Sequence, residues 1–585
     1  MKVAVLTRSY DNARTGSNTQ ETVLTPAQVS QHGMKKLFSL QLSGDAVGIE
    51  AQPLIVPDVT MADGSVHDVV YLASMANTVW AFDANSGAQL WPRPISLGTP
   101  IAGNKKLDLY QINDHWGILS TPVIDLDTKT MYVVNWSSPD GSVANAVHRL
   151  HAIDIVTGAA RHPPLDIQGS FPQVGRPPVT FHSPGQKQRA ALLLTRAPDV
   201  NGRFRKTLFM ACGSVQETGI NSHGWVLAFD LDSFSTTAAW CSTPADHGGG
   251  IWQGAQGPAA DDQGNIYAMT GNGNWDGQSD FSESFVKLHY AAPQGGQPAG
   301  LAITDWWTPF TEKSDAKTGL NGRKHNQTNN RGYDWGDQDL GSGGPVVIQK
   351  FGLVVGAGKD GILYVLDQNK FGKTALADLL NPAQNYSKLK SPPIFFTYFP
   401  GFAVNPAPQD PTNLNAYFVD NKTHHLHGSP VFWDGPDHGP MLFCWGENES
   451  LRAWSVNNSG KLTYVAIGHE VASKGAAGPQ GHGGMPGGML CLSANGNQAG
   501  TGIVWALAPL NGDANSQRVQ GILRAYDAAN YDTDAQGNKF LRLLWSSGPQ
   551  NTFKHNKFNP PVVANGKVYV PTYDDRVDVY GLNAP

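Results

Sequence analysis

Residues 69–91 read VVYLASMANTVWAFDANSGAQLW, and this stretch decides the fold of the chain. Residues 69–74 and 78–83 are rich in Val, Tyr, Phe and Trp, with the apolar alternation that is typical of half-buried β-strands. Asn85, Ser86 and Gly87 are turn residues. The stretch therefore predicts two neighbouring antiparallel strands, a turn after Asp83, and a Trp at position 91.

The same pattern recurs seven more times along the chain. The further copies lie at 131–134 with 150–154, 207–210 with 226–230, 266–269 with 285–288, 353–356 with 363–367, 441–444 with 451–454, 503–506 with 523–527, and 567–570 with 577–580. Short sheets of this kind cannot each bury two faces alone, whereas radial packing solves that problem and leaves only short edges.

The repeats predict an all-β fold in which residues 1–585 form a single eight-bladed β-propeller domain of four-stranded antiparallel blades. No stretch shows a sustained helical period of 3.6. The last copy is too short for four strands, so we expect an N-terminal strand to complete it and close the ring between the two ends of the chain. Residues 3–6, Val-Ala-Val-Leu, are the segment expected to do so.

Composition excludes several function classes. The net charge is −6 and no basic run occurs, which argues against nucleic-acid binding. No window approaches the ~18 apolar residues of a membrane span. Four cysteines without a CxxC motif exclude a disulfide scaffold, a zinc ribbon and a covalent c-type haem. The apolar run at residues 3–6 is shorter than a secretory h-region. We therefore expect a cytoplasmic protein, or a periplasmic or secreted one from which a signal peptide has been removed.

The repeat unit, Ala81-Phe82-Asp83 with Gly87 and Trp91, resembles that of the quinoprotein alcohol dehydrogenases. Those proteins are eight-bladed propellers that bind pyrroloquinoline quinone (PQQ) and a Ca²⁺ or lanthanide ion on the propeller axis. Similar repeats occur in the assembly lipoproteins of the outer membrane, which are not enzymes. Function therefore has to be argued from individual site residues.

Three segments resemble the quinone contacts of that family. Residues 49–54, IEAQPL, resemble the segment that supplies a cofactor-contacting Glu, here Glu50. Residues 250–254, GIWQG, resemble the loop whose Trp lies beneath the quinone, here Trp252. Residues 358–361, GKDG, resemble the segment whose Lys contacts the quinone oxygens, here Lys359.

Three further segments resemble the metal and catalytic motifs. Residues 211–217, ACGSVQE, resemble the segment with a metal-ligating Glu, here Glu217, and 267–275, YAMTGNGNW, the motif whose Asn binds the metal, here Asn272. Residues 334–339, DWGDQD, resemble the motif in which the first Asp, here Asp337, is the catalytic base, and the second, Asp339, is an added lanthanide ligand. Oxygen donors are what these hard ions prefer.

The resemblance implies a mechanism. The metal polarises the quinone carbonyl, Asp337 takes the hydroxyl proton of the substrate, and Lys359 stabilises charge on the reduced quinone. It thus implies a small-molecule alcohol, aldehyde or sugar as substrate. Because the chain has no haem motif, a separate electron acceptor is expected.

The chain departs from the family pattern at one important place. The family has two adjacent cysteines above the quinone, but Cys212, Cys241, Cys444 and Cys491 are far apart in the sequence. Residues 113–122, NDHWGILSTP, stand where the cysteine pair is expected. The covering of the quinone must therefore differ, and a cofactor-free propeller that serves as a binding or assembly platform stays open as an alternative.

A histidine motif gives a second alternative. His425 and His427 lie two residues apart in a segment expected to be extended, so their side chains point to the same face. Imidazole suits Cu, Fe and Zn, and these histidines would form an alternative metal site, with His115 or His482 as possible third ligands. The competing interpretation is that both histidines are hydrogen-bonded residues of the channel.

Overall fold

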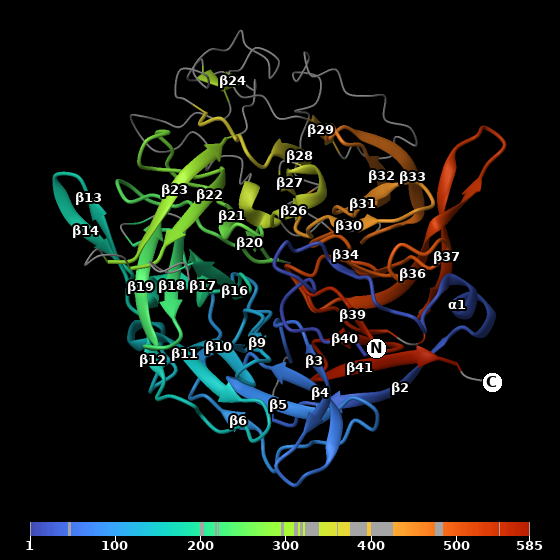
Figure 1. Ribbon diagram of the computed structural model, residues 1–585, viewed down its shortest axis with the longest axis horizontal. Helices are drawn as coiled ribbons and strands as arrows, with labels where there is room; N and C mark the ends of the chain where they lie inside the picture. The colour runs from blue at the N-terminus through green and yellow to red at the C-terminus, as the bar shows by residue number, and fades with distance from the viewer. Residues whose placement is uncertain are drawn as a thin grey trace.

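The computed structural model describes residues 2–44, 48–198, 204–216, 219, 221–254, 256–293, 298–308, 314–315, 320–321, 339–359, 361–374, 395–398, 425–473, 484–548, 550 and 552–583. Within these ranges the chain is built almost wholly of strands (Figure 1). The helix α1 (Pro26–His32) is a short exception, capped by Thr25, whose hydroxyl accepts from the Gln28 N–H. No helix among the described residues is long and apolar enough to cross a membrane.

Eight antiparallel blades surround a common axis, and the colours in Figure 1 run round the ring in chain order. From the axis outward the blades are β3 (Leu54–Thr60), β4 (Val66–Ala73), β5 (Thr78–Asp83), β6 (Ile95–Ser96); β9 (Val123–Asp125), β10 (Thr130–Ser137), β11 (Val147–Asp154), β12 (Leu165–Asp166); β16 (Leu193–Pro198), β17 (Phe204–Ser214), β18 (Trp225–Asp230), β19 (Ser235–Cys241); β20 (Ala259–Ala260), β21 (Asn265–Met269), β22 (Phe285–Ala291), β23 (Gly300–Trp307); β26 (Val346–Ile348), β27 (Leu353–Ala357), β28 (Ile362–Asp367), β29 (Phe395–Tyr398); β30 (Val431–Asp434), β31 (Pro440–Cys444), β32 (Ser450–Val456), β33 (Leu462–Val471); β34 (Met489–Ser493), β35 (Ile503–Pro509), β36 (Gln520–Thr533), β37 (Lys539–Ser546); and β39 (Val562–Ala564), β40 (Lys567–Pro571), β41 (Arg576–Leu582), β2 (Met34–Gln41). The predicted eight-bladed fold is confirmed.

The repeated Asp has a local role at the end of the third strand. Asp83 Oδ1 accepts the N–H groups of Asn85 and Ser86, at 2.9 and 2.6 Å, and so holds the tight turn that follows β5. Asp154 accepts in the same way after β11, and Asp527, within β36, accepts the N–H groups of Ala529 and Asn530. The Asp of these units thus has a local structural role and is not evidence of chemistry.

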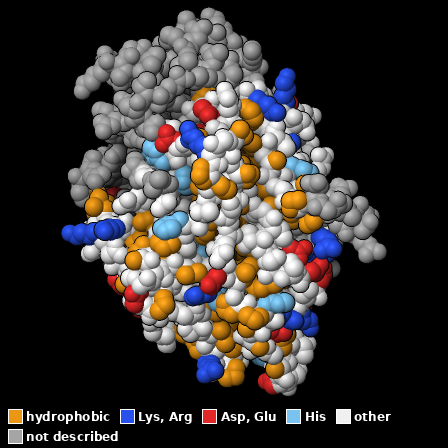
Figure 2. Space-filling model, turned by 90° about the vertical axis from the view of Figure 1, so that its left-hand side faces the viewer, with side chains coloured by type: hydrophobic (Ala, Val, Ile, Leu, Met, Phe, Trp, Pro, Cys, Tyr) orange, Lys and Arg blue, Asp and Glu red, His pale blue; other side chains and the backbone are white. Residues whose placement is uncertain are grey.

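The hydrophobic cores lie mainly between blades. The cluster around Val69 and Tyr71 of the first blade includes Met131 and Ile153 of the second. Each blade therefore buries its faces against its neighbours, which is why the repeats predict a ring. On the face shown in Figure 2, positive and negative side chains are scattered among uncharged surface, in keeping with a chain in which only 15% of residues are charged.

The closing strand differs from the expected one. The eighth blade is completed by β2, which pairs antiparallel with β41 from Met34 opposite Leu582 to Gln41 opposite Arg576. The expectation that residues 3–6 close the ring is therefore wrong. Residues 3–6 are a continuous apolar run, and β2 mixes apolar and charged residues, so the long-range pairing with β41 could not be predicted from either local pattern.

Residues 5–18 instead form what we call the N-terminal hoop, which touches every blade in chain order. Its backbone contacts are Val5 with Ile55, Leu6 with Ile124, Asn12 with Ala260, Ala13 with Val347, Thr15 with Phe432 and Gly16 with Leu492. Side chains reach the remaining two blades, because Asn12 donates to the Leu194 carbonyl and Asn18 to the Val563 carbonyl. Arg14 is fully buried within the hoop and donates to the Leu192 and Pro258 carbonyls.

Candidate functional site

All the predicted site residues that the structure describes lie at one rim of the ring. In an antiparallel blade, the residues just before the innermost strand meet those just after the second strand. Glu50, Trp252, Asp339 and His427 each precede an innermost strand, and Lys359 follows the second strand β27. We call this end of the channel the axial rim.

Trp252 lies flat against backbone at the axial rim. A Cβ added to Gly213 would stand 2.8 Å from two atoms of the indole ring, and one added to Gly250 would stand 2.8 Å from Nε1. Only glycine permits this approach at both positions. The indole is half-buried and is therefore held in place on one side without being enclosed.

Asn272, Asp339 and Lys359 adjoin this indole. Asp339 and Asn272 exchange two hydrogen bonds, since each backbone N–H donates to the other's side-chain oxygen at 3.1 Å. The other Asp339 oxygen lies 2.8 Å from Lys359 Nζ. A Cβ on Gly271 would stand 2.3 Å from Asp339 Oδ1 and 3.1 Å from Trp252 Cδ1. These residues thus come together at one place.

The predicted Ca²⁺ site is only partly described. Asn272 and Asp339 offer oxygens, but these are engaged by each other's N–H groups and by the Lys359 ammonium. The two donors do not by themselves fit a hard cation. Glu217 and Asp337, the other predicted ligands, lie outside the described residues.

Glu50 lies in a second part of the axial rim, among buried cations. Its carboxylate is 3.0 Å from Arg189 Nε and accepts hydrogen bonds from Tyr573 at 2.7 Å and Asn113 at 3.1 Å. Burial alone would raise the pKa of Glu50, but Arg189 and Lys557, with these two hydrogen bonds, lower it below its ordinary value. Glu50 is therefore ionised in the folded protein.

Three cations lie near Glu50, and we call Lys187, Arg189 and Lys557 the cation cluster; Asp108 also acts on the two lysines. Lys187 donates to the Leu107 carbonyl at 2.5 Å and lies 4.1 Å from the centre of the Trp116 ring. The Arg189 guanidinium lies 4.7 Å from the centre of the Phe558 ring. Burial lowers the pKa of Lys187 to about 7 and also lowers the pKa of Lys557. The cluster therefore favours a bound anion, because a negative charge nearby would raise the pKa of both lysines and return their amines to the charged form.

The lowered pKa of Lys187 has a measurable consequence. Between about pH 7 and pH 10 the Lys187 amine is protonated in the unfolded chain and neutral in the folded one. Because the unfolded chain binds the additional proton, the free energy of unfolding rises with pH in this range, by up to about 1.4 kcal/mol per pH unit. We expect wild type to gain stability relative to Lys187→Met between pH 7 and pH 9 in denaturant unfolding. A difference between the two proteins that stays constant over this range would contradict the assignment.

His425 and His427 meet Glu447 in a third part of the axial rim. All three side chains are buried, and their ligand atoms lie within 4.8 Å of one another. His427 Nε2 is 2.9 Å from Glu447 Oε1, and His425 Nδ1 is 3.9 Å from Glu447 Oε2. Burial, with His425, Lys359 and the cation cluster nearby, lowers the pKa of His427 well below its ordinary value. His115 lies in β8 (His115–Trp116), outside this group, and His482 lies outside the described residues.

Phe558 connects these parts. Its ring centre is 5.8 Å from that of His427, the Arg189 guanidinium lies over its ring, and a Cβ on Gly254 would stand 3.0 Å from it. Residues of the first, third, fourth, sixth and eighth blades are therefore neighbours across the axis.

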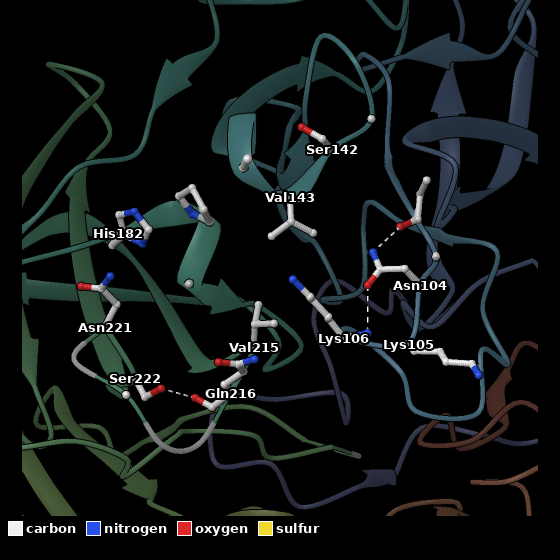
Figure 3. A pocket seen from close by; sticks show the side chains of 17 residues that line it. Asn104, Lys105, Lys106, Ser142, Val143, His182, Val215, Gln216, Asn221 and Ser222 are labelled. Atoms are coloured by element: carbon white, nitrogen blue, oxygen red, sulfur yellow. Dashed lines mark hydrogen bonds between the residues drawn. The ribbon is translucent and has the colours of Figure 1, made fainter.

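A cavity of about 890 Å³ opens between the second and third blades. Figure 3 shows Lys106 extending into it, with His182 and Gln216 on its wall. None of its lining residues is a predicted quinone or metal contact, although Gln216 precedes Glu217. The predicted site residues that the structure describes therefore lie outside this cavity.

The residue pattern missed Glu447 and the cation cluster. Glu447 comes three residues after β31, as Asn272 comes three residues after β21 and Glu217 three after β17. That shared position in the repeat is a signal that could have identified Glu447. The cation cluster carries no such signal, because its members come from different blades.

The four cysteines are buried and unpaired. Residues 113–116, from the segment that replaces the cysteine pair, line the axial rim through Asn113, which donates to Glu50, and Trp116, which lies under Lys187.

No protein-family model and no curated protein matches the chain. Solved structures do match it in fold. A quinohemoprotein alcohol dehydrogenase from Pseudomonas putida HK5 is 13% identical with a TM-score of 0.52, over 100% of this chain and 80% of that one. The quinohemoprotein alcohol dehydrogenase from Comamonas testosteroni is 13% identical with a TM-score of 0.53, over 100% and 81%. A europium-containing methanol dehydrogenase is 12% identical with a TM-score of 0.50, over 99% and 98%. At these identities the likeness shows a shared eight-bladed propeller fold.

Proposed function

We propose that this chain is a dehydrogenase of an alcohol, aldehyde or sugar that binds PQQ at the axial rim. The observation that carries the proposal is the juxtaposition of Trp252 with Asn272, Asp339 and Lys359. Those residues come from separate segments that resemble quinoprotein motifs, and their meeting at one place is what the resemblance requires.

The charge at the axial rim suits this cofactor. PQQ is a flat quinone with three carboxylates, and three cations, Lys187, Arg189 and Lys557, gather beside Glu50 at this rim. Trp252 offers a fixed indole for a flat ring, and Arg189 and Lys187 offer charge and hydrogen bonds. The described residues thus fit a planar polyanion.

The chain's own residues have the following proposed roles. Trp252 holds the ring plane, Lys359 faces a quinone oxygen, and the cation cluster faces carboxylates. Asp337, which lies outside the described residues, takes the proton of the substrate hydroxyl, and Lys359, 2.8 Å from Asp339, stabilises charge on the reduced quinone. The bound quinone supplies the two-electron acceptor chemistry. The electrons then pass to a separate acceptor.

The test uses the full-length protein and PQQ. We expect the protein to retain PQQ through gel filtration and to reduce a dye with at least one member of an alcohol, aldehyde and sugar panel. Loading with PQQ alone, with Ca²⁺ and with Eu³⁺ tests the predicted ligands Glu217, Asn272, Asp337 and Asp339. Lys359→Met should lower the rate of dye reduction at least tenfold, a loss of about 1.4 kcal/mol of transition-state stabilisation.

Lys350→Met is the matched control, because Lys350 also pairs with an Asp, at 2.7 Å, but at an exposed site. It should behave as wild type. If no quinone absorbance stays with the protein and no dye is reduced, the dehydrogenase proposal fails and the binding-platform alternative is favoured.

A further inference from the structure

We propose that His425, His427 and Glu447 bind one divalent first-row transition-metal ion in an open, three-ligand site of the kind that Zn²⁺ and Fe²⁺ occupy in enzymes. This site is separate from the predicted Ca²⁺ ligands and does not depend on the quinone proposal. It would be a metal centre with two nitrogen ligands, distinct in chemistry from the predicted oxygen-ligated Ca²⁺ site.

The distances carry the first step. Ligand atoms that bond one tetrahedral ion at about 2.1 Å lie about 3.4 Å from one another. His427 Nε2 and Glu447 Oε1 are 2.9 Å apart, and His425 Nδ1 and Glu447 Oε2 are 3.9 Å apart. The His427–Glu447 contact is close but does not have the alignment of a hydrogen bond. These atoms therefore face a common point, and small side-chain rotations let all three residues bind one ion.

The backbone fixes both ligand segments. The Glu447 N–H donates to the His425 carbonyl at 2.9 Å, which ties the two segments together. Leu426 lies between the two histidines. Its N–H donates to the Gly358 carbonyl at 3.1 Å, and the Leu426 carbonyl accepts from the Ser342 hydroxyl at 2.7 Å. The backbone at Leu426 and Glu447 thus cannot shift without breaking these hydrogen bonds, so the two ligand segments are held close to each other.

Ligand chemistry selects the class of ion. Two imidazoles and one carboxylate suit Zn²⁺, Fe²⁺ or Cu²⁺, whereas Ca²⁺ and Mg²⁺ prefer oxygen ligands alone. Three protein ligands leave at least one position for water or substrate, as in catalytic sites. All three side chains are buried, with exposed fractions of 8%, 3% and 2% for His425, His427 and Glu447. Burial of all three ligands favours a site of defined stoichiometry.

The neighbouring cations influence which ligand occupies the open coordination position. Lys359 and the cation cluster act electrostatically on His427, and one carboxylate does not cancel the charge of a divalent ion. The arrangement therefore favours an anionic ligand in the open position, such as hydroxide or a carboxylate. Of the described carboxylates, Asp339 and Glu50 already pair with Lys359 and Arg189, and we assign the open position to a ligand from solvent or substrate.

Cobalt binding tests the site directly. Full-length protein is stripped with a chelator in the absence of PQQ and titrated with Co²⁺, whose visible absorption reports coordination number. We expect one Co²⁺ per chain, bands of a four- or five-coordinate ion, displacement by Zn²⁺, and a metal-dependent rise in melting temperature. Glu447→Gln and His427→Gln should each weaken binding at least tenfold and abolish that rise.

His162→Ala is the control, because His162 is exposed and stacks on Phe234 far from the rim; it should bind as wild type. Glu447→Asp, which keeps the charge but withdraws the carboxylate, serves if a Gln variant fails to fold, and should also weaken binding. Wild type that binds no Co²⁺, or Glu447 and His427 variants that bind like wild type, would overturn the proposal. Since PQQ is absent throughout, either result leaves the dehydrogenase proposal to its own test.

Discussion

Glu50→Gln is expected to lower the free energy of unfolding by about 3–5 kcal/mol, the usual cost of removing one partner of a buried ion pair. The substitution keeps the shape of the side chain but leaves Arg189 buried without its carboxylate, with Lys187 and Lys557 close by. The three cations then repel one another without the Glu50 charge between them, and Asp108 compensates only part of that repulsion. Denaturant unfolding at neutral pH measures the loss.

The pH dependence gives the same prediction a second readout. Because the folded pKa of Glu50 lies below its ordinary value of 4.5, the carboxylate stabilises the folded protein above that pH and loses its contribution as pH falls through the folded pKa. The difference between wild type and Glu50→Gln should therefore narrow below pH 4.5.

Asp166→Asn provides the control for Glu50. Arg149 Nε pairs with Asp166 at 2.6 Å, but Asp166 is 56% exposed. Exposed pairs contribute about 0–1 kcal/mol, so this variant should be nearly neutral. Equal effects of the two substitutions would show that Glu50 does not compensate the cation cluster.

Gly271→Ala is expected to weaken PQQ binding at least tenfold, or about 1.4 kcal/mol. The new methyl group would stand 2.3 Å from Asp339 Oδ1 and 3.1 Å from Trp252 Cδ1, so one or both side chains must move. Added volume in a packed site costs about 1–3 kcal/mol. The displacement separates Asp339 from Lys359 and tilts the indole while leaving the blades intact.

Gly300→Ala is the matched control, since it begins β23 and a Cβ there meets no atom within 4 Å. It should bind PQQ as wild type does. Fluorescence quenching by PQQ measures affinity, and circular dichroism checks the fold. Wild-type affinity in Gly271→Ala would mean that the arrangement of Trp252 and Asp339 does not hold the cofactor.

Local pattern was sufficient for the blades and insufficient for their closure. Seven of the blades are formed by strands close together in the sequence, and a turn such as that held by Asp83 punctuates them, so period and turn chemistry identify them. The choice between residues 3–6 and β2 depends on pairing across most of the chain, which no local period encodes. Residues 3–6 are the more apolar of the two segments, yet it is β2 that pairs with β41.

The site residues also differ in whether the local sequence predicts them. Trp252, Asn272 and Lys359 follow recognisable motifs, and the structure brings them together. Lys187 and Lys557 lie far apart in the sequence, and their lowered pKa values come from burial near Glu50. An isolated lysine in a sequence gives no sign of that environment. Glu447 is intermediate, because its position in the repeat is informative once the strands are aligned.

The N-terminal hoop sets the order in which the molecule can be completed during synthesis. Residues 5–18 leave the ribosome before any blade, yet they bond to all eight, and Asn18 finds its last partner 545 positions later. Their backbone groups must stay solvated or borrow temporary partners until the eighth blade exists. Contacts of such long range form slowly, so closure of the hoop is a late event that joins independently formed blades into one cooperative unit.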